Sequence, residues 1–161
     1  EIYQCDWSSD VCSSDLFRHK AHFLIAEVGP RGGSRPALGH YAAGSRRFIP
    51  VTECPVHAPK GNDLAFAFLR QVADLAPRSR EVLRSLAIRV AAHTSDAMVT
   101  IFATADADRA LRGATRRFIE RETPTSVHLN LHERDDAYVF GPHTRTLIGP
   151  ASITEIGRAH V

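Results

Sequence analysis

The sequence predicts an α+β fold built from an antiparallel or mixed sheet and two helices. Short runs of β-branched and aromatic residues, bounded by Gly and Pro, are typical of strands. Two longer segments repeat their apolar residues every three or four positions, as amphipathic helices do. The order strand, helix, hairpin, helix, strand indicates a split β-α-β (ferredoxin-like) arrangement, here with a β-meander in front and a hairpin at the end.

Three short strands are predicted for the front meander, at residues 19–28, 38–42 and 48–51. The segments GPRGGSRP and AGSRR between them are rich in turn-forming residues. The first helix follows, with Asn62 or Asp63 placed to cap its start and Pro77 to end it. Its apolar face is Leu64, Phe68, Val72 and Leu75.

A second hairpin is predicted at residues 85–92 and 97–103. The second helix then opens at Asp106 and ends before Pro124. Five arginines on this helix suit either an anionic ligand or a solvated surface. Its apolar residues are Leu111, Ala114, Phe118 and Ile119, and its arginines are Arg109, Arg112, Arg116, Arg117 and Arg121.

Residues 125–132 alternate apolar and polar side chains, as a half-buried strand does. His128, Asn130 and His132 share the polar side, and we expect this side to be exposed rather than to bind a metal. A turn at residues 135–136 leads into residues 138–140, and residues 144–148 form the last predicted strand.

The two ends of the chain encode each other. Asp10 to Leu16 (DVCSSDL) back-translates to GAC GTG TGC TCT TCC GAT CT, and the complementary strand in another frame encodes Ile156 to Val161 (IGRAHV). This string resembles a widely used short-read sequencing adapter. We therefore expect residues 1–16 and 156–161 to be translated adapter sequence. Residues 17–155 are expected to form one domain, an internal piece of a longer gene product.

Without these ends the formal net charge rises from +2 to +5, because one of the 20 basic residues and four of the 18 acidic residues are removed. Arginine dominates the remaining positive charge, and its planar donors suit phosphates and carboxylates. This weakly favours an anionic partner. The removed residues are Arg158 and Glu1, Asp6, Asp10 and Asp15.

Several common functional motifs are missing from the sequence. There is no G-x-G-x-x-G, no G-x-x-x-x-G-K-S/T and no H-E-x-x-H. Cys54 and His57 have the spacing of two metal ligands, but no second pair completes a zinc site. No apolar run is long enough to cross a membrane, and we expect a cytoplasmic location.

Three segments carry a resemblance to a known family: FRHKAHF, GHYAAGSRRFIPVTECPVH and VHLNLHERDDAYVFGPHTRTLIGP. Together they resemble the central domain of the S-adenosylmethionine-dependent RNA (uracil-5-)-methyltransferases, which act on ribosomal and transfer RNA. In that family a C-P-V/I/L step follows the meander. The family pattern G-x-x-T-x-x-L-x-G, matched here by residues 141–149, leads into the methyltransferase domain.

The resemblance implies that the parent protein methylates carbon 5 of uridine in rRNA or tRNA. The family's catalytic Cys and carboxylate and its Rossmann-like cofactor domain lie beyond the position of Glu155. We therefore expect no catalytic and no S-adenosylmethionine-binding residue here, and an inactive fragment whose partner is that missing domain. Family members often hold a 4Fe-4S cluster, and the resemblance makes Cys54 its fourth ligand. Because the companion ligands are missing, we expect Cys54 to be a free, half-buried thiol that holds no cluster.

The role left to this chain is to position structured RNA. We expect Arg18, Lys20, Arg46 and Arg47, which flank the meander strands, to contact phosphates near one edge. No DNA or membrane partner is expected. A second interpretation stays open: a non-catalytic ferredoxin-like ligand-binding or interaction module without an RNA role, because one fold serves many functions.

Overall fold

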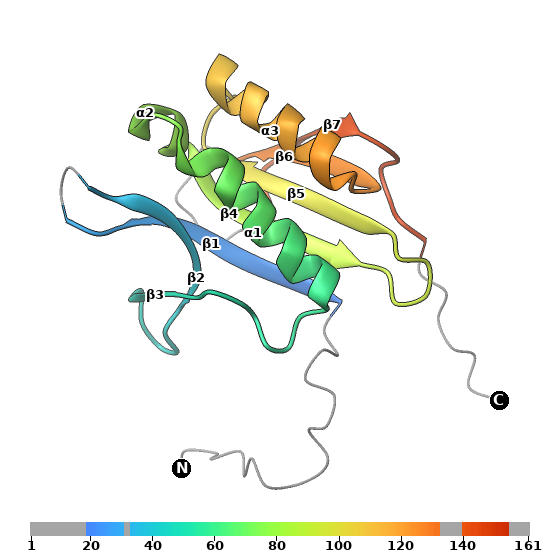
Figure 1. The fold of residues 1–161 in the computed structure, drawn as a ribbon, viewed down its shortest axis with the longest axis horizontal. Helices are drawn as coiled ribbons and strands as arrows, with labels where there is room; N and C mark the ends of the chain where they lie inside the picture. Colours follow the sequence, from blue (N-terminus) through green and yellow to red (C-terminus); the bar gives the residue numbers. More distant parts are fainter. Residues whose placement is uncertain (1–18, 31–32, 133–139, 155–161) are drawn as a thin grey trace, which may run out of the picture.

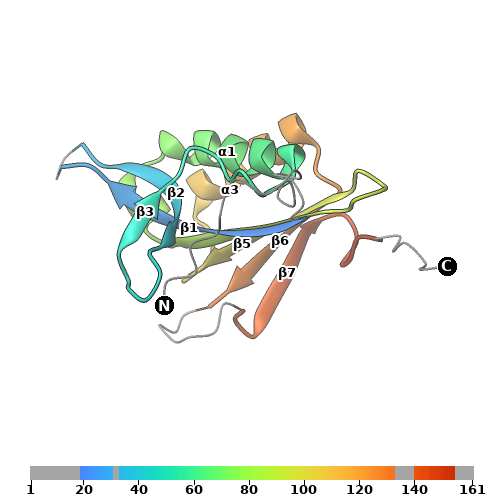
Figure 2. The ribbon, with the colours of Figure 1, turned by 90° about the horizontal axis from the view of Figure 1, so that it is seen from below.

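The computed structural model describes residues 19–30, 33–132 and 140–154. In this part of the chain a seven-stranded sheet carries α1 and α3 on one face (Figures 1 and 2). The elements are β1 (Lys20–Val28), β2 (Arg35–Tyr41), β3 (Phe48–Pro50), α1 (Pro59–Ala73), α2 (Pro77–Arg80), β4 (Leu83–Val90), β5 (Ala97–Ala103), α3 (Arg109–Glu122), β6 (Ser126–Leu131) and β7 (His143–Ile148).

The strands are arranged in the order β3-β2-β1-β4-β5-β6-β7. All neighbours are antiparallel except β5 and β6, which α3 connects as a parallel pair. The predicted α+β class, the mixed sheet and the front meander are therefore confirmed. The short helix α2 was not predicted, because Pro77 begins it rather than only ending the previous helix.

The strand order contradicts the ferredoxin-like arrangement. In a split β-α-β unit another strand lies between the two parallel strands, whereas β5 and β6 pair directly, with Met98 opposite Ser126. The strand before α1 that joins this region, β1, instead pairs antiparallel with β4. Periodicity predicts the order of elements along the chain, but pairing depends on contacts between distant residues, which periodicity does not encode.

The hydrophobic core lies between the sheet and the two long helices. Phe23 of β1 and Leu86 and Ile88 of β4 are fully buried on the sheet. Phe68 of α1 meets Phe118 of α3 edge to face, with ring centroids 5.4 Å apart. No helix in the described residues is long and apolar enough to span a membrane.

Both long helices begin at a residue other than the predicted cap. Helix α1 starts at Pro59, after Ala58, so Asn62 and Asp63 lie inside it. Helix α3 is capped by Asp108, whose side chain accepts a hydrogen bond from the Leu111 amide at 2.7 Å, and not by Asp106. Asp106 instead pairs with Arg145 of β7, a contact across the fold. Its end at Thr123, before Pro124, is as predicted.

Candidate functional site

The predicted RNA-contacting residues do not form one cluster. Arg18 lies outside the described residues. Lys20 opens β1 and is exposed, directly opposite Arg89 of β4. Arg46 and Arg47 are exposed in the turn between β2 and β3. Because β2 lies between β1 and β3, the arginine pair occupies the sheet edge and Lys20 does not.

Lys20 and Arg89 place two positive charges opposite each other on neighbouring strands. Neither forms an ion pair within the described residues, and both are exposed. Like charges directly opposite each other destabilise a sheet, so this pair favours contact with an external anion. Sequence analysis missed Arg89, because only the β1–β4 register places it beside Lys20.

The Cys54 region is held together by Asn62. The Cys54 amide donates to Asn62 Oδ1 at 2.9 Å, and Asn62 Nδ2 donates to the Cys54 carbonyl at 2.9 Å. The Cys54 thiol is free and half-buried. Asn62 therefore organises the loop before α1 instead of capping the helix.

His57 does not combine with Cys54 into a metal site. The described residues contain no group of three or more His, Cys, Asp or Glu side chains arranged to hold a metal. His57 is fully buried, and its ring packs against Phe23. Burial, with a smaller contribution from His19, lowers the pKa of His57 to about 4. His57 is therefore a neutral core residue at physiological pH.

The polar side of β6 is buried, which contradicts the predicted exposure. His128 and His132 are each 4% exposed and Asn130 is fully buried. His128 Nδ1 lies 3.1 Å from Thr146 Oγ1 of β7. Asn130 Nδ2 donates to the Gly141 carbonyl at 3.0 Å and to Thr144 Oγ1 at 2.7 Å. Pairing with β7 provides these partners, and strand alternation alone cannot predict it.

The residues matching G-x-x-T-x-x-L-x-G have structural roles around this pairing. The Gly141 amide donates to Asn130 Oδ1 at 2.7 Å, and a Cβ at Gly141 would lie 1.9 Å from the Leu131 carbonyl oxygen. Gly149 has φ +76°, which favours glycine. Asn130, Gly141 and Thr144 thus form a clip that joins β6 to the start of β7.

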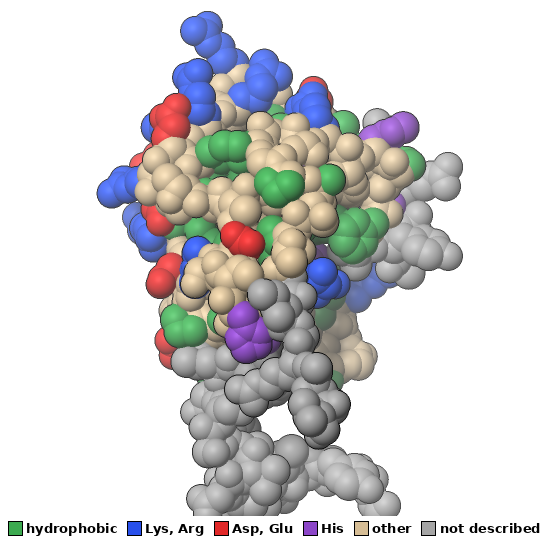
Figure 3. All heavy atoms as spheres, turned by 90° about the vertical axis from the view of Figure 1, so that its right-hand side faces the viewer, with side chains coloured by type: hydrophobic (Ala, Val, Ile, Leu, Met, Phe, Trp, Pro, Cys, Tyr) green, Lys and Arg blue, Asp and Glu red, His purple; other side chains and the backbone are tan. Residues whose placement is uncertain are grey.

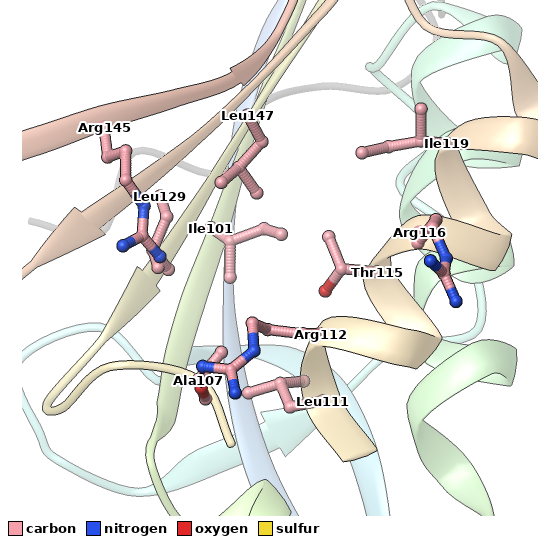
Figure 4. Close-up of a pocket in the computed structure, with 10 residues that line it drawn as sticks. All are labelled: Ile101, Ala107, Leu111, Arg112, Thr115, Arg116, Ile119, Leu129, Arg145 and Leu147. Carbon is pink, nitrogen blue, oxygen red and sulfur yellow. Dashed lines mark hydrogen bonds between the residues drawn. The ribbon is translucent and has the colours of Figure 1, made fainter. Parts of the chain in front are cut away.

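A cavity of about 270 Å³ lies between α3 and strands β5, β6 and β7 (Figure 4). Ile101, Leu129 and Leu147 from the sheet face Leu111 and Ile119 of α3. Thr115 and three arginines complete the lining, which contains no His, Cys, Asp or Glu. The cavity therefore provides no ionisable general acid or base from those residue types.

Two of the arginines at this cavity already have partners. Arg145 forms an ion pair with Asp106 at 2.8 Å, and its hydrogen bond is the main cause of the lowered pKa of Asp106. Arg112 Nη1 donates to the Ala107 carbonyl at 2.6 Å. The cavity is therefore an apolar space with a positively charged rim.

No protein-family model matches the chain. The chain is 26% identical over 147 residues to a protein of Gloeobacter violaceus named an uncharacterized RNA methyltransferase, covering 87% of this chain and 32% of the relative. It is 29% identical over 130 residues to a protein of Parasynechococcus marenigrum with the same description, covering 76% and 28%. The chain therefore spans about a third of the length of these curated relatives.

Among solved structures, the fold is similar to the Pyrococcus abyssi tRNA (uracil-54, C5)-methyltransferase, which was solved in complex with S-adenosyl-L-homocysteine. The TM-score is 0.60 at 14% identity, covering 87% of this chain and 33% of that one. At this identity the similarity concerns the fold alone. The chain is thus related in sequence to proteins named RNA methyltransferases, and it folds like about a third of a tRNA methyltransferase.

Proposed function

We propose that this chain is the RNA-positioning part of a methyltransferase that transfers a methyl group from S-adenosylmethionine to carbon 5 of uridine in tRNA or rRNA. One observation carries the proposal: the sequence relationship and the fold similarity each extend over 87% of the chain. The RNA is contacted, in this proposal, through Lys20, Arg46 and Arg47. Guanidinium and ammonium groups suit phosphate oxygens and position RNA without reading its sequence.

S-adenosylmethionine does not fit the cavity described above. The cofactor carries positive charges on its sulfonium and ammonium groups, whereas arginines form the charged part of the lining and no carboxylate balances them there. We therefore assign cofactor binding and the methyl-transfer step to the rest of the parent protein. Calorimetry on this chain should detect no saturable binding of S-adenosylmethionine at micromolar concentration.

A 4Fe-4S cluster does not fit the described residues either. Such a cluster normally requires four thiolates, and Cys54 is the free cysteine of the described part. Its backbone is held by Asn62, so the loop is ordered without a cluster. Cys54 is proposed as a cluster ligand only in a parent protein that supplies the other thiolates, and purified chain should contain no iron or sulfide.

RNA binding is tested by comparing two exposed arginines at opposite ends of β2. Arg47 lies in the β2–β3 turn and Arg35 opens β2, so Arg47→Glu and Arg35→Glu change the charge equally. Filter binding to a folded tRNA transcript should show an affinity that falls steeply with salt. Arg47→Glu should weaken it about fivefold or more, and Arg35→Glu should not. RNA affinity that is absent or independent of salt would support the non-catalytic interaction module instead.

Methyl transfer is tested on the longer parent protein. Replacing the hydrogen at carbon 5 of uridine by a methyl group releases that hydrogen, so RNA tritiated at carbon 5 should lose tritium when S-adenosylmethionine is added. The chain described here should release none. Methylation of another base or position by the parent protein, without tritium release, would reject the uridine carbon 5 assignment.

The adapter interpretation gives a third proposal, that residues 1–16 and 156–161 take no part in the domain; both segments lie outside the described residues. A variant without them should keep the melting temperature and RNA affinity of the full chain. A loss of cooperative unfolding in that variant would reject this domain boundary.

A further inference from the structure

A groove on the helical side of the molecule is lined by arginines from three helices. Two adjoining hollows of about 500 and 610 Å³ share Arg117. Figure 3 shows basic side chains gathered at the top of the molecule, the level at which Figure 1 places α2 and the start of α3. We call this feature the arginine groove; its arginines are Arg70, Arg78, Arg109, Arg117 and Arg121.

The five guanidinium groups of the groove have no internal partners. Within the described residues none of them donates a hydrogen bond or forms an ion pair, and all five are exposed. Elsewhere the chain does pair its arginines: Arg80 binds Glu27 at 2.9 Å and Arg145 binds Asp106 at 2.8 Å. Five neighbouring cations repel one another, so an external anion would relieve this repulsion.

The acidic residues of the groove offset only part of this charge. Asp74, Asp108 and Glu122 line the same hollows. The two carboxylate oxygens of Asp108 accept hydrogen bonds from the Leu111 amide and the Ser79 hydroxyl. These bonds chiefly lower the pKa of Asp108, and Arg78 contributes less. Because three acids face five arginines, the groove keeps a net positive charge.

The arginines are spaced along one flank of α3. Arg109, Arg117 and Arg121 extend over twelve helical steps, about 18 Å. Arg112 and Arg116 lie on the other flank and line the apolar cavity instead. The floor between the groove arginines includes small residues, Ala76, Ala110 and Gly113, so a ligand can approach α3 closely. A row of this length suits a chain of phosphates rather than a single anion.

We propose that the arginine groove binds the sugar-phosphate backbone of structured RNA, as a contact surface separate from the β2–β3 turn. Planar guanidinium groups form paired hydrogen bonds with phosphate oxygens. The choice of RNA rests on the proposed function. A membrane surface fits less well, because Leu75 is the one large apolar side chain lining the two hollows.

Adjacent residues of α3 provide a matched test. Arg117→Gln/Arg121→Gln removes two charges from the groove flank, and Arg112→Gln/Arg116→Gln removes two from the opposite flank of the same helix. Affinity for a folded tRNA transcript is measured between low and moderate salt, with melting temperatures as the folding control. The groove variant should bind about tenfold more weakly, and its salt dependence should fall by about one ion per lost contact. The control should change much less.

Arg78→Gln/Arg109→Gln is a second groove variant, used if the first is unstable, with the same expected loss. Equal losses in groove and control variants would overturn the proposal, because they would reflect net charge alone. Normal RNA affinity in both groove variants, together with weaker binding by Arg47→Glu, would overturn the groove and keep the proposed function. A wild-type chain that binds vesicles of anionic phospholipid but no RNA would overturn both.

Discussion

Gly61 and Gly113 allow the same substitution in two helices, with opposite expected results. A Cβ at Gly61 in α1 would lie 2.0 Å from His57 Cε1 and 2.5 Å from Nε2. A Cβ at Gly113 in α3 would meet only Arg117 Nη1, at 3.5 Å, which is an ordinary contact. His57 is fully buried and its ring lies edge to face with Phe23, 6.2 Å between centroids. The ring therefore has little room to move away from Gly61.

The magnitudes follow from two competing effects. Alanine is favoured over glycine in a helix interior by about 1 kcal/mol. Nothing offsets this gain at Gly113, so Gly113→Ala should stabilise the protein by up to about 1 kcal/mol. At Gly61 the clash with a buried ring costs about 1–3 kcal/mol, as overpacked cores do. The expected net result of Gly61→Ala is a loss of about 1–2 kcal/mol.

Urea unfolding of the two variants and the wild type measures these differences, with equal dependence on urea as the check for two-state behaviour. The corresponding change in melting temperature is about 2–4 °C per kcal/mol. If Gly61→Ala is as stable as the wild type, His57 must relocate freely and the packing argument is wrong. A destabilised Gly113→Ala would refute the open surface assigned to α3.

Two further predictions concern buried polar groups. Asn130→Ala removes three hydrogen bonds to Gly141 and Thr144, which at about 1 kcal/mol each should cost about 3 kcal/mol in urea unfolding; a loss below about 1 kcal/mol would contradict the clip. Because burial lowers the pKa of His57 from 6.5 to about 4, the unfolded chain binds more protons between these pH values, and stability falls as pH is lowered through them. The stability difference between wild type and His57→Gln should therefore shrink by about 3 kcal/mol from pH 7 to pH 4, whereas a constant difference would contradict the assignment.

Local patterns in the sequence predicted the elements that depend on neighbouring residues. The spacing of Leu64, Phe68 and Val72 predicted α1, and these residues are buried in the structure. The start of α1 was missed because Asn62 is a common cap residue, yet its side chain binds Cys54. Pro59 at the first helical position was the available signal.

Features that depend on distant residues were not predictable from these patterns. Asp106 and Asp108 are both reasonable caps, and the Arg145 ion pair decides between them. The alternation in β6 predicted two kinds of side chain but not that β7 would provide hydrogen-bond partners for the polar ones. Strand order failed for the same reason, since parallel pairing of β5 and β6 is a long-range contact.

The same distinction separates the family-like motif from the residues proposed to bind RNA. Asn130, Gly141 and Thr144 match a recognisable pattern, and their hydrogen bonds place β7 beside β6 without presenting a reactive group. The groove arginines have no fixed spacing along the chain: Arg70 and Arg78 precede α3 by a hairpin and join it only in the folded protein. Motif substitutions should therefore reduce stability first, whereas groove substitutions should reduce RNA affinity with little loss of stability. Function in this domain is best tested by changing charge on its helical surface.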